Sequence, residues 1–224
     1  MPRDEYQDHL KSLREDVLYM SEIVVDRLQM GLNSLERKDE ELAREVIDGD
    51  HEINELYLDL EQDCIDLIAL QQPVAGDLRF IAASFKIITD LERIADLATN
   101  LGEYTLDARQ DTFPDVDVQE IGAATIEMIE ESMIAYGDED TEMCYRIAER
   151  DDDIDEMCET ASELVARDLI EREGITSEEQ IQETMQDVYR LLLTIRDLER
   201  VGDHAVNIAA RTLYMVESDD DLLY

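Results

Sequence analysis

The sequence predicts an all-α protein made of two tandem three-helix bundles related by an internal repeat. Apolar residues recur at spacings of three, four and seven along most of the 224 residues, as on helices with one buried face. Only 3 prolines and 8 glycines interrupt the chain, and these are the strongest helix breakers. The two halves also repeat the same motifs. Helices of about 30 residues would be roughly 45 Å long, so we expect an elongated molecule.

Three helices are expected in the first half. The first carries an apolar stripe that includes Leu13, Val17 and Val24, and a charged break at residues 37–39 separates it from the second. The second ends before Pro73, because proline lacks a backbone donor and disfavours helix at the preceding residue. The expected helices cover residues 4–37, 40–71 and 75–107.

The second half repeats this plan with helices expected over residues 116–136 and 139–172 and from a capping box to residue 216. Gly137 and Asp138 predict the first turn, and Gly174 predicts a C-cap for the middle helix. The sequence T-x-x-E, from Thr176 to Glu179, predicts a capping box that opens the last helix. The final residues, ESDDDLLY, are expected to be frayed.

The repeat is carried by two pairs of motifs. DLERIAD at residues 90–96 matches DLERVGD at 197–203 with an offset of 199 − 92 = 107 residues. GDHEIN near residue 50 matches RDDDID near residue 151 with an offset of 151 − 50 = 101 residues. The difference falls in a connection between helices, where insertions are tolerated. We therefore predict two repeats, residues 1–108 and 109–224.

The net charge is −40. Helical apolar periodicity along the chain favours a folded protein with an acidic surface over a disordered chain. Lysine occurs only at Lys11, Lys38 and Lys86, and scarce lysine with abundant acid indicates adaptation to high salt, where ions screen self-repulsion. The absence of a basic stripe argues against nucleic acid and anionic lipid as partners.

Cellular location is predicted from the cysteines and the absence of targeting signals. Cys64, Cys144 and Cys158 lie in helical apolar patterns without a CxxC motif, so we interpret them as buried small hydrophobes in a reducing compartment. No signal peptide and no apolar run of 18 residues is visible. A cytoplasmic protein without membrane insertion is expected.

The residues most suited to chemistry are oxygen-bearing side chains four residues apart on helices. This spacing places them in rows on one helix face. If neighbouring helices bring the rows together, they could hold a hard cation, or iron or manganese bound by carboxylates. The candidate metal ligands are Asp50, Glu92, Asp96, Asn100, Asp151, Asp155, Glu199, Asp203 and Asn207.

Another interpretation of these residues remains open. In a chain with 59 acidic residues, pairs at this spacing also arise by chance on a solvated face. Arg93 and Arg200 follow Asp90 and Asp197 by three residues, which predicts ion pairs within each helix. His204 is expected at the surface or behind the ligands. No P-loop, dinucleotide fingerprint or nucleophile elbow occurs, so no catalytic residue is assigned.

Three segments resemble the signatures of the PhoU family: QQPVAGDLR (residues 71–79), DLERIADLATN (90–100) and DLERVGDHAVNIA (197–209). The resemblance covers nearly the whole chain. It implies two similar three-helix bundles, usually dimeric, and a negative regulator of phosphate uptake that works with the phosphate transporter and, in bacteria, a membrane sensor kinase. Some members hold multinuclear iron or zinc clusters through acidic-x-x-x-Asp motifs. Asn54 departs from that pattern, as does Ala95 in place of a glycine.

We therefore weigh three functions. The first, which the resemblance supports, is a cytosolic adaptor that acts on the ATPase subunit of the phosphate transporter. The second is a carboxylate-metal enzyme of the di-iron kind, suggested by the paired rows. The third is a structural helical adaptor with neither metal nor a role in phosphate uptake.

Overall fold

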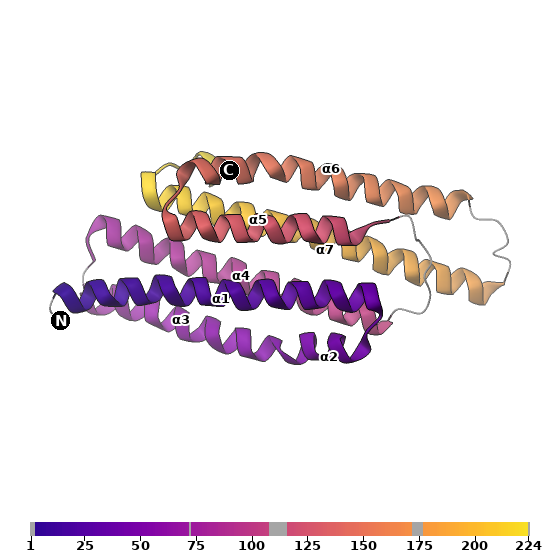
Figure 1. Cartoon of the computed structure of the whole chain (residues 1–224), viewed down its shortest axis with the longest axis horizontal. Coiled ribbons are helices and arrows are strands. Elements are labelled where there is room, and N and C mark those ends of the chain that lie inside the picture. Colours follow the sequence, from indigo (N-terminus) through magenta and orange to yellow (C-terminus); the bar gives the residue numbers. More distant parts are fainter. Residues whose placement is uncertain (1–2, 72, 108–115, 172–176, 224) are drawn as a thin grey trace.

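The computed structural model describes residues 3–71, 73–107, 116–171 and 177–223. Consecutive long helices run antiparallel to one another and give an elongated molecule (Figure 1). Every regular element in the described ranges is helical, which confirms the predicted all-α class. The elements are α1 (Arg3–Arg37), α2 (Glu40–Asp48), α3 (Asp50–Gln71), α4 (Ala75–Asp107), α5 (Val118–Asp138), α6 (Thr141–Glu171), α7 (Glu178–Glu217) and η1 (Asp221–Leu223).

The break between α1 and α2 occurs where the sequence predicts it. Lys38 adopts a left-handed conformation with φ 53°, which stops α1. The Asp39 carboxylate then accepts hydrogen bonds from the backbone amides of Glu41 and Leu42 at 3.0 and 3.1 Å. These bonds satisfy donors that have no acceptor within the helix, so α2 begins at Glu40.

The expected helix over residues 40–71 is divided at Gly49 into α2 and α3. Arg27 of α1 donates to the carbonyl oxygen of Glu45 at 3.1 Å and pairs with Glu52 at 3.3 Å. A Cβ atom at Gly49 would lie 2.0 Å from Arg27 Nη1. The break therefore accommodates the guanidinium of a neighbouring helix, which periodicity within one helix does not reveal.

The turn between α5 and α6 lies two residues beyond the predicted Gly137-Asp138. Helix α5 includes both residues, and Glu139 takes the left-handed conformation with φ 58°. Arg14 of α1 donates to the Gly137 carbonyl oxygen at 3.0 Å and to the Glu139 carboxylate at 2.5 Å. This contact binds the end of α5 from outside the repeat and favours the later turn.

The ends of α7 also differ from the prediction. Its capping box is formed by Ser177 and Gln180, one residue later than expected, while Thr176 and Gly174 lie outside the described residues. The tail does not fray completely, because residues 221–223 form η1 and Leu222 packs against the core.

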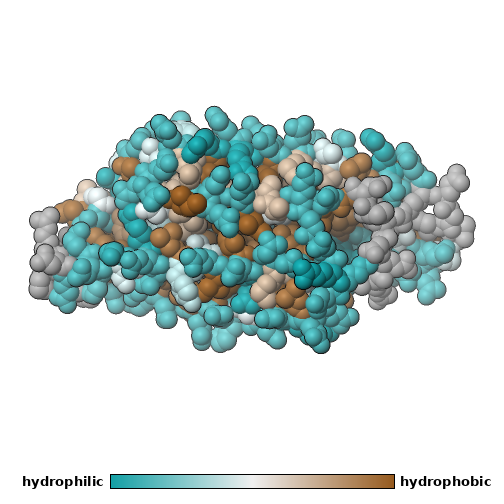
Figure 2. Space-filling view, viewed as in Figure 1, coloured by the Kyte–Doolittle hydropathy of each residue, from teal (hydrophilic) through white to brown (hydrophobic). Residues whose placement is uncertain are grey.

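The hydrophobic core is one continuous cluster of residues from both repeats. Helices α4 and α7 pack together at the centre, and α1 packs against α5, so both pairs join the two halves of the chain. Figure 2 shows apolar side chains among a largely hydrophilic surface. Cys64, Cys144 and Cys158 are buried, as predicted, and burial raises the pKa of Cys64 to about 12. Among the described residues, no helix is sufficiently long and apolar to cross a membrane.

Candidate functional site

Carboxylates of α6 and α7 form an acidic cluster in the second repeat, which we call the second acidic cluster: Asp151, Asp155, Glu199 and Asp203. Burial, followed by the charges of Asp155 and Asp203, raises the pKa of Asp151 to about 6. Burial and the charge of Asp155 also raise the pKa of Glu199 and of Asp203. The two rows predicted from sequence therefore lie close enough to repel one another.

One oxygen atom of this cluster has no partner. Asp151 Oδ1 is buried and accepts no hydrogen bond. It lies 3.4 Å from where a Cβ atom of Gly202 would be, which is an ordinary packing distance and places this oxygen against the backbone of α7. A buried, unpaired carboxylate oxygen among other carboxylates is costly unless a proton or a cation compensates it.

The first acidic cluster consists of Asp50 of α3 and Glu92 and Asp96 of α4. Burial, followed by the charge of Asp96, raises the pKa of Glu92, and burial with the charge of Asp50 raises that of Asp96. Asn54 donates to Asp50 Oδ2 at 2.7 Å. Arg93 lies 3.5 Å from Glu92 and 3.9 Å from Asp96. Asn54 and Arg93 thus compensate part of the negative charge and hydrogen-bonding capacity of the first acidic cluster.

The two asparagines of the predicted rows are placed differently from each other. Asn100 of α4 donates its amide to Asp197 Oδ2 of α7 at 3.0 Å, so it contributes to a contact between the repeats. Asn207 is exposed on α7. A ligand role for either residue stays a prediction.

The predicted ion pairs between Asp90 and Arg93 and between Asp197 and Arg200 were wrong: neither pair is among the described contacts. Each aspartate instead faces the other repeat. Asp90 Oδ1 lies 2.8 Å from His204 Nδ1. The reason is the packing of α4 on α7, which brings partners from the opposite helix to these half-buried or buried aspartates.

Asp197 is the more enclosed of the two, with a fully buried side chain. It accepts hydrogen bonds from Asn100 and, at 2.7 Å, from the Tyr104 hydroxyl, and it pairs with Arg196 at 2.6 Å. Sequence reasoning missed this network, although the first residue of each repeated DLER motif was a signal for it. These contacts fix the relative position of α4 and α7, and hence of the acidic clusters beside them.

The chemistry of the second acidic cluster fits a cation. In the ranges that the structure describes, no three His, Cys, Asp or Glu side chains converge as they would around a metal ion. The unpaired Asp151 oxygen and the mutual repulsion of its neighbours are nevertheless what a bound cation would relieve. Carboxylate oxygens suit iron, manganese, zinc and harder cations. The first acidic cluster fits less well, because Asn54 and Arg93 already partner it.

The arrangement of these helices has known counterparts. The PhoU domain family model matches residues 17–105 and 118–212. The chain belongs to the PhoU family. Its two matched segments correspond to the internal repeat, which confirms the repeated architecture.

Named members of the PhoU family are similar over nearly the whole chain. The chain is 33% identical over 218 residues to "Phosphate-specific transport system accessory protein PhoU homolog 1" of Methanothermobacter thermautotrophicus, covering 96% of this chain and 95% of that one. A homologue of Thermotoga maritima with the same description is 33% identical over 213 residues, covering 94% and 88%. These relatives are accessory proteins of phosphate transport.

Solved PhoU structures have the same fold. The crystal structure of PhoU from Pseudomonas aeruginosa superposes with a TM-score of 0.86 at 28% identity, covering 96% of this chain and all of that one. The crystal structure of the phosphate transport system regulatory protein PhoU from Streptococcus pneumoniae gives 0.85 at 25% identity, covering 96% and 98%.

Proposed function

We propose that this chain is a cytoplasmic negative regulator of phosphate uptake that acts on the ATPase subunit of a phosphate ABC transporter. The observation that carries the proposal is PhoU family membership over both repeats, with relatives described as phosphate-specific transport system accessory proteins. The protein would act as an adaptor and not as an enzyme. The family resemblance also favours a homodimer. It further favours a sensor kinase as a second partner, in organisms that have one.

A deletion strain complemented with the wild-type gene tests this regulation. In phosphate-replete medium at native salt, phosphate uptake should rise in the deletion strain and return to the original rate after complementation. The ATPase subunit should co-purify with the tagged protein in the same medium. Unchanged uptake together with no recovered transporter subunit would overturn the proposal.

We further propose that the acidic clusters bind iron, zinc or manganese. Support comes from the unpaired Asp151 oxygen and from the mutually raised pKa values around it. Asp151 and Asp155 of α6 with Glu199 and Asp203 of α7 would hold the metal. The metal would neutralise the cluster and tie α6 to α7, so that binding could affect the surface presented to a partner.

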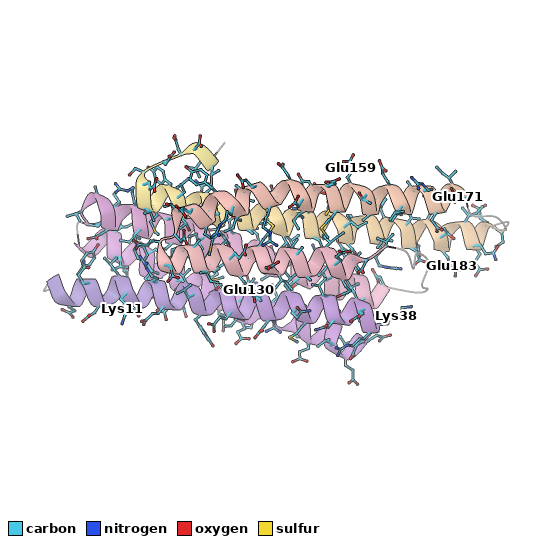
Figure 3. The ribbon with its side chains drawn as sticks, turned by 45° about the horizontal axis from the view of Figure 1, so that its top comes forward. Lys11, Lys38, Glu130, Glu159, Glu171 and Glu183 are labelled. Carbon is cyan, nitrogen blue, oxygen red and sulfur yellow. The ribbon has the colours of Figure 1, made fainter. Side chains whose placement is uncertain are left out.

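Metal content by plasma mass spectrometry tests this second proposal. The protein is purified without chelator, beside a variant in which Glu199 and Asp203 become glutamine and asparagine. A matched control carries Glu159→Gln on the exposed side of α6 (Figure 3). We expect stoichiometric metal in the wild type and the control and loss in the double variant. Equal metal content in all three proteins, or none in the wild type, would contradict ligation by these residues.

A further inference from the structure

A pocket is lined by residues of α1, of the beginning of α4, of the turn after α5 and of the end of α7. The corresponding helix ends lie at one end of the molecule (Figure 1). The pocket is separate from both acidic clusters, which lie further along the helices. Its apolar lining residues include Leu10 and Phe80. The lining also includes the charged residues Lys11, Arg14, Asp77, Arg79 and Glu139, together with Gly76.

Three of the 19 cationic side chains of this acidic chain gather around the pocket. Arg79 has a buried Nε atom without a hydrogen-bond partner. Arg14 is held over the Phe80 ring at 4.9 Å by its bonds to α5. Lys11 is exposed on α1 (Figure 3) and pairs only loosely with Glu15, at 3.4 Å. The charges of the Arg79 and Arg14 guanidinium groups and of the Lys11 ammonium make the lining suited to an oxyanion.

The beginning of α4 adds backbone donors. The residue before this helix is Val74, whose side chain has no oxygen to cap it, and Leu78 is the residue whose amide bonds back to the Val74 carbonyl, at 2.9 Å. The preceding amides of the first turn therefore have no acceptor in the helix. A Cβ atom at Gly76 would meet nothing within 4 Å, so a ligand can approach the backbone there.

The two carboxylates of the pocket favour an oxyanion that carries a proton. Asp77 and Glu139 can only accept hydrogen bonds when ionised. Hydrogen phosphate can donate to such a carboxylate, whereas sulfate carries no proton at neutral pH. The Tyr6 hydroxyl lies beside Asp77, and burial, followed by the charge of Asp77 and a hydrogen bond to it, raises the pKa of Tyr6. The lining thus combines donors for oxygen atoms with acceptors for one O–H group.

We propose that this pocket binds the hydrogen-bearing phosphate group, either as inorganic phosphate or as the terminal phosphate of a nucleotide. Two residues of the site are not repeated in the second half of the chain. At the repeat offset of 184 − 77 = 107 residues, Asp77 and Arg79 correspond to Thr184 and Gln186, so the repeated architecture does not account for it. Binding follows from the pocket alone; that the bound phosphate regulates transport rests on the function proposed above.

Isothermal titration calorimetry at high KCl tests the site, with inorganic phosphate, sulfate and ATP as separate probes. Arg79→Gln should weaken phosphate binding by roughly tenfold or more, since it removes a charged donor. Arg44→Gln, which makes the same change on exposed α2, should leave binding unchanged. Lys11→Gln, at an exposed position, should weaken it severalfold and tests the site even if Arg79→Gln fails to fold. Asp77→Asn should reduce the preference for phosphate over sulfate.

The outcomes separate the sources and the two proposals. Phosphate binding at least as tight as ATP binding assigns the pocket to the free anion, and ATP binding that is tenfold tighter and Arg79-dependent assigns it to a nucleotide. The proposal is overturned if neither probe binds the wild type or if the Lys11 and Arg79 variants bind like it. The calorimetric experiment measures phosphate binding directly and does not depend on co-purification of the transporter. If the regulatory function proposed above were wrong, phosphate binding to the pocket would still be observed.

Discussion

At the scale of single residues, Asp197 has the most demanding environment among the carboxylates of the α4–α7 contact. Its side chain is 0% exposed. Its charge is paired with that of Arg196, and it accepts hydrogen bonds from Tyr104 and Asn100. A buried charge is tolerated only with such partners. The network therefore holds the repeats in one register, and removing Tyr104 or Asn100 leaves the buried Asp197 carboxylate with one donor fewer.

Asp197→Ala should accordingly lower the free energy of unfolding by about 3 kcal/mol, because three donors lose their acceptor. Tyr104→Phe, which removes one donor, should cost about 1 kcal/mol. Denaturant unfolding at constant salt measures both. The exposed Asp152→Ala serves as the control and should stay within about 0.5 kcal/mol of the wild type. A loss below about 1 kcal/mol for Asp197→Ala would mean that the network contributes little.

The second acidic cluster should make stability depend on pH when the protein is metal-free. The folded-state pKa of Asp151, about 6, exceeds its ordinary value of 3.8, so folding favours the protonated acid. This contribution is fully present below about pH 4 and is lost as pH rises through 6. Asp151→Asn should therefore match the wild type near pH 4 and exceed its stability by about 1 kcal/mol at pH 7, solvent screening part of the repulsion.

Thermal unfolding of chelator-treated protein between pH 4 and 8 measures this difference. A difference that is constant with pH would show that the ionisation of Asp151 is not coupled to folding. Adding back the metal should reverse the order at pH 7, because the wild-type carboxylate would then be a ligand.

At the scale of elements, some helix boundaries are set by the local sequence and others by contacts with neighbouring helices. The expected limits 75–107 agree with α4, because Pro73 precedes it and the apolar stripe continues to its end. The division at Gly49 was missed, since its cause is Arg27 of another helix. Local signals predict where a helix can start, while contacts from other elements move or interrupt its end.

Gly49→Ala should lower the free energy of unfolding by about 1 kcal/mol, because the new methyl group displaces the Arg27 guanidinium from its partners. In an Arg27→Ala background the same change should be neutral or stabilising, since alanine is the better helix former. A double-mutant cycle by denaturant unfolding gives the coupling. Equal effects of Gly49→Ala in both backgrounds would rule out the proposed clash.

At the scale of the whole molecule, the two repeats share one core. Helices α4 and α7 bury apolar residues against each other, so neither three-helix unit encloses its own apolar surface. The predicted boundary between residues 108 and 109 therefore separates two sequence repeats. We expect the two repeats to fold together as one unit.

Residues 1–108 and 109–224, expressed separately, should lack cooperative unfolding, because each exposes the face of α4 or α7 that the other covers. Circular dichroism melts and size-exclusion chromatography would detect this. Co-expression of the two halves is the matched control and should restore a sharp transition. Independent cooperative folding of either half would show that it has a sufficient core of its own.

The net charge of −40 predicts stabilisation by salt. Between 0.1 and 1 M KCl the Debye length falls from about 10 Å to about 3 Å, which screens repulsion among surface carboxylates. Tm should rise on the order of 5–10 °C over this range. Little further rise is expected above 1 M. Scanning calorimetry in KCl and NaCl checks it, and a Tm that is independent of salt would contradict adaptation to high salt.

The sequence by itself determined the helical class, the repeat and the acidic rows, because periodicity, breakers and repeated motifs are local properties. It also identified the family through three motifs. Tertiary structure alone decided the partners of Asp90 and Asp197, the break at Gly49 and the gathering of Lys11, Arg14 and Arg79 around one pocket. These features depend on which helix faces lie together, and that is settled by burial across the whole chain and not by any single segment.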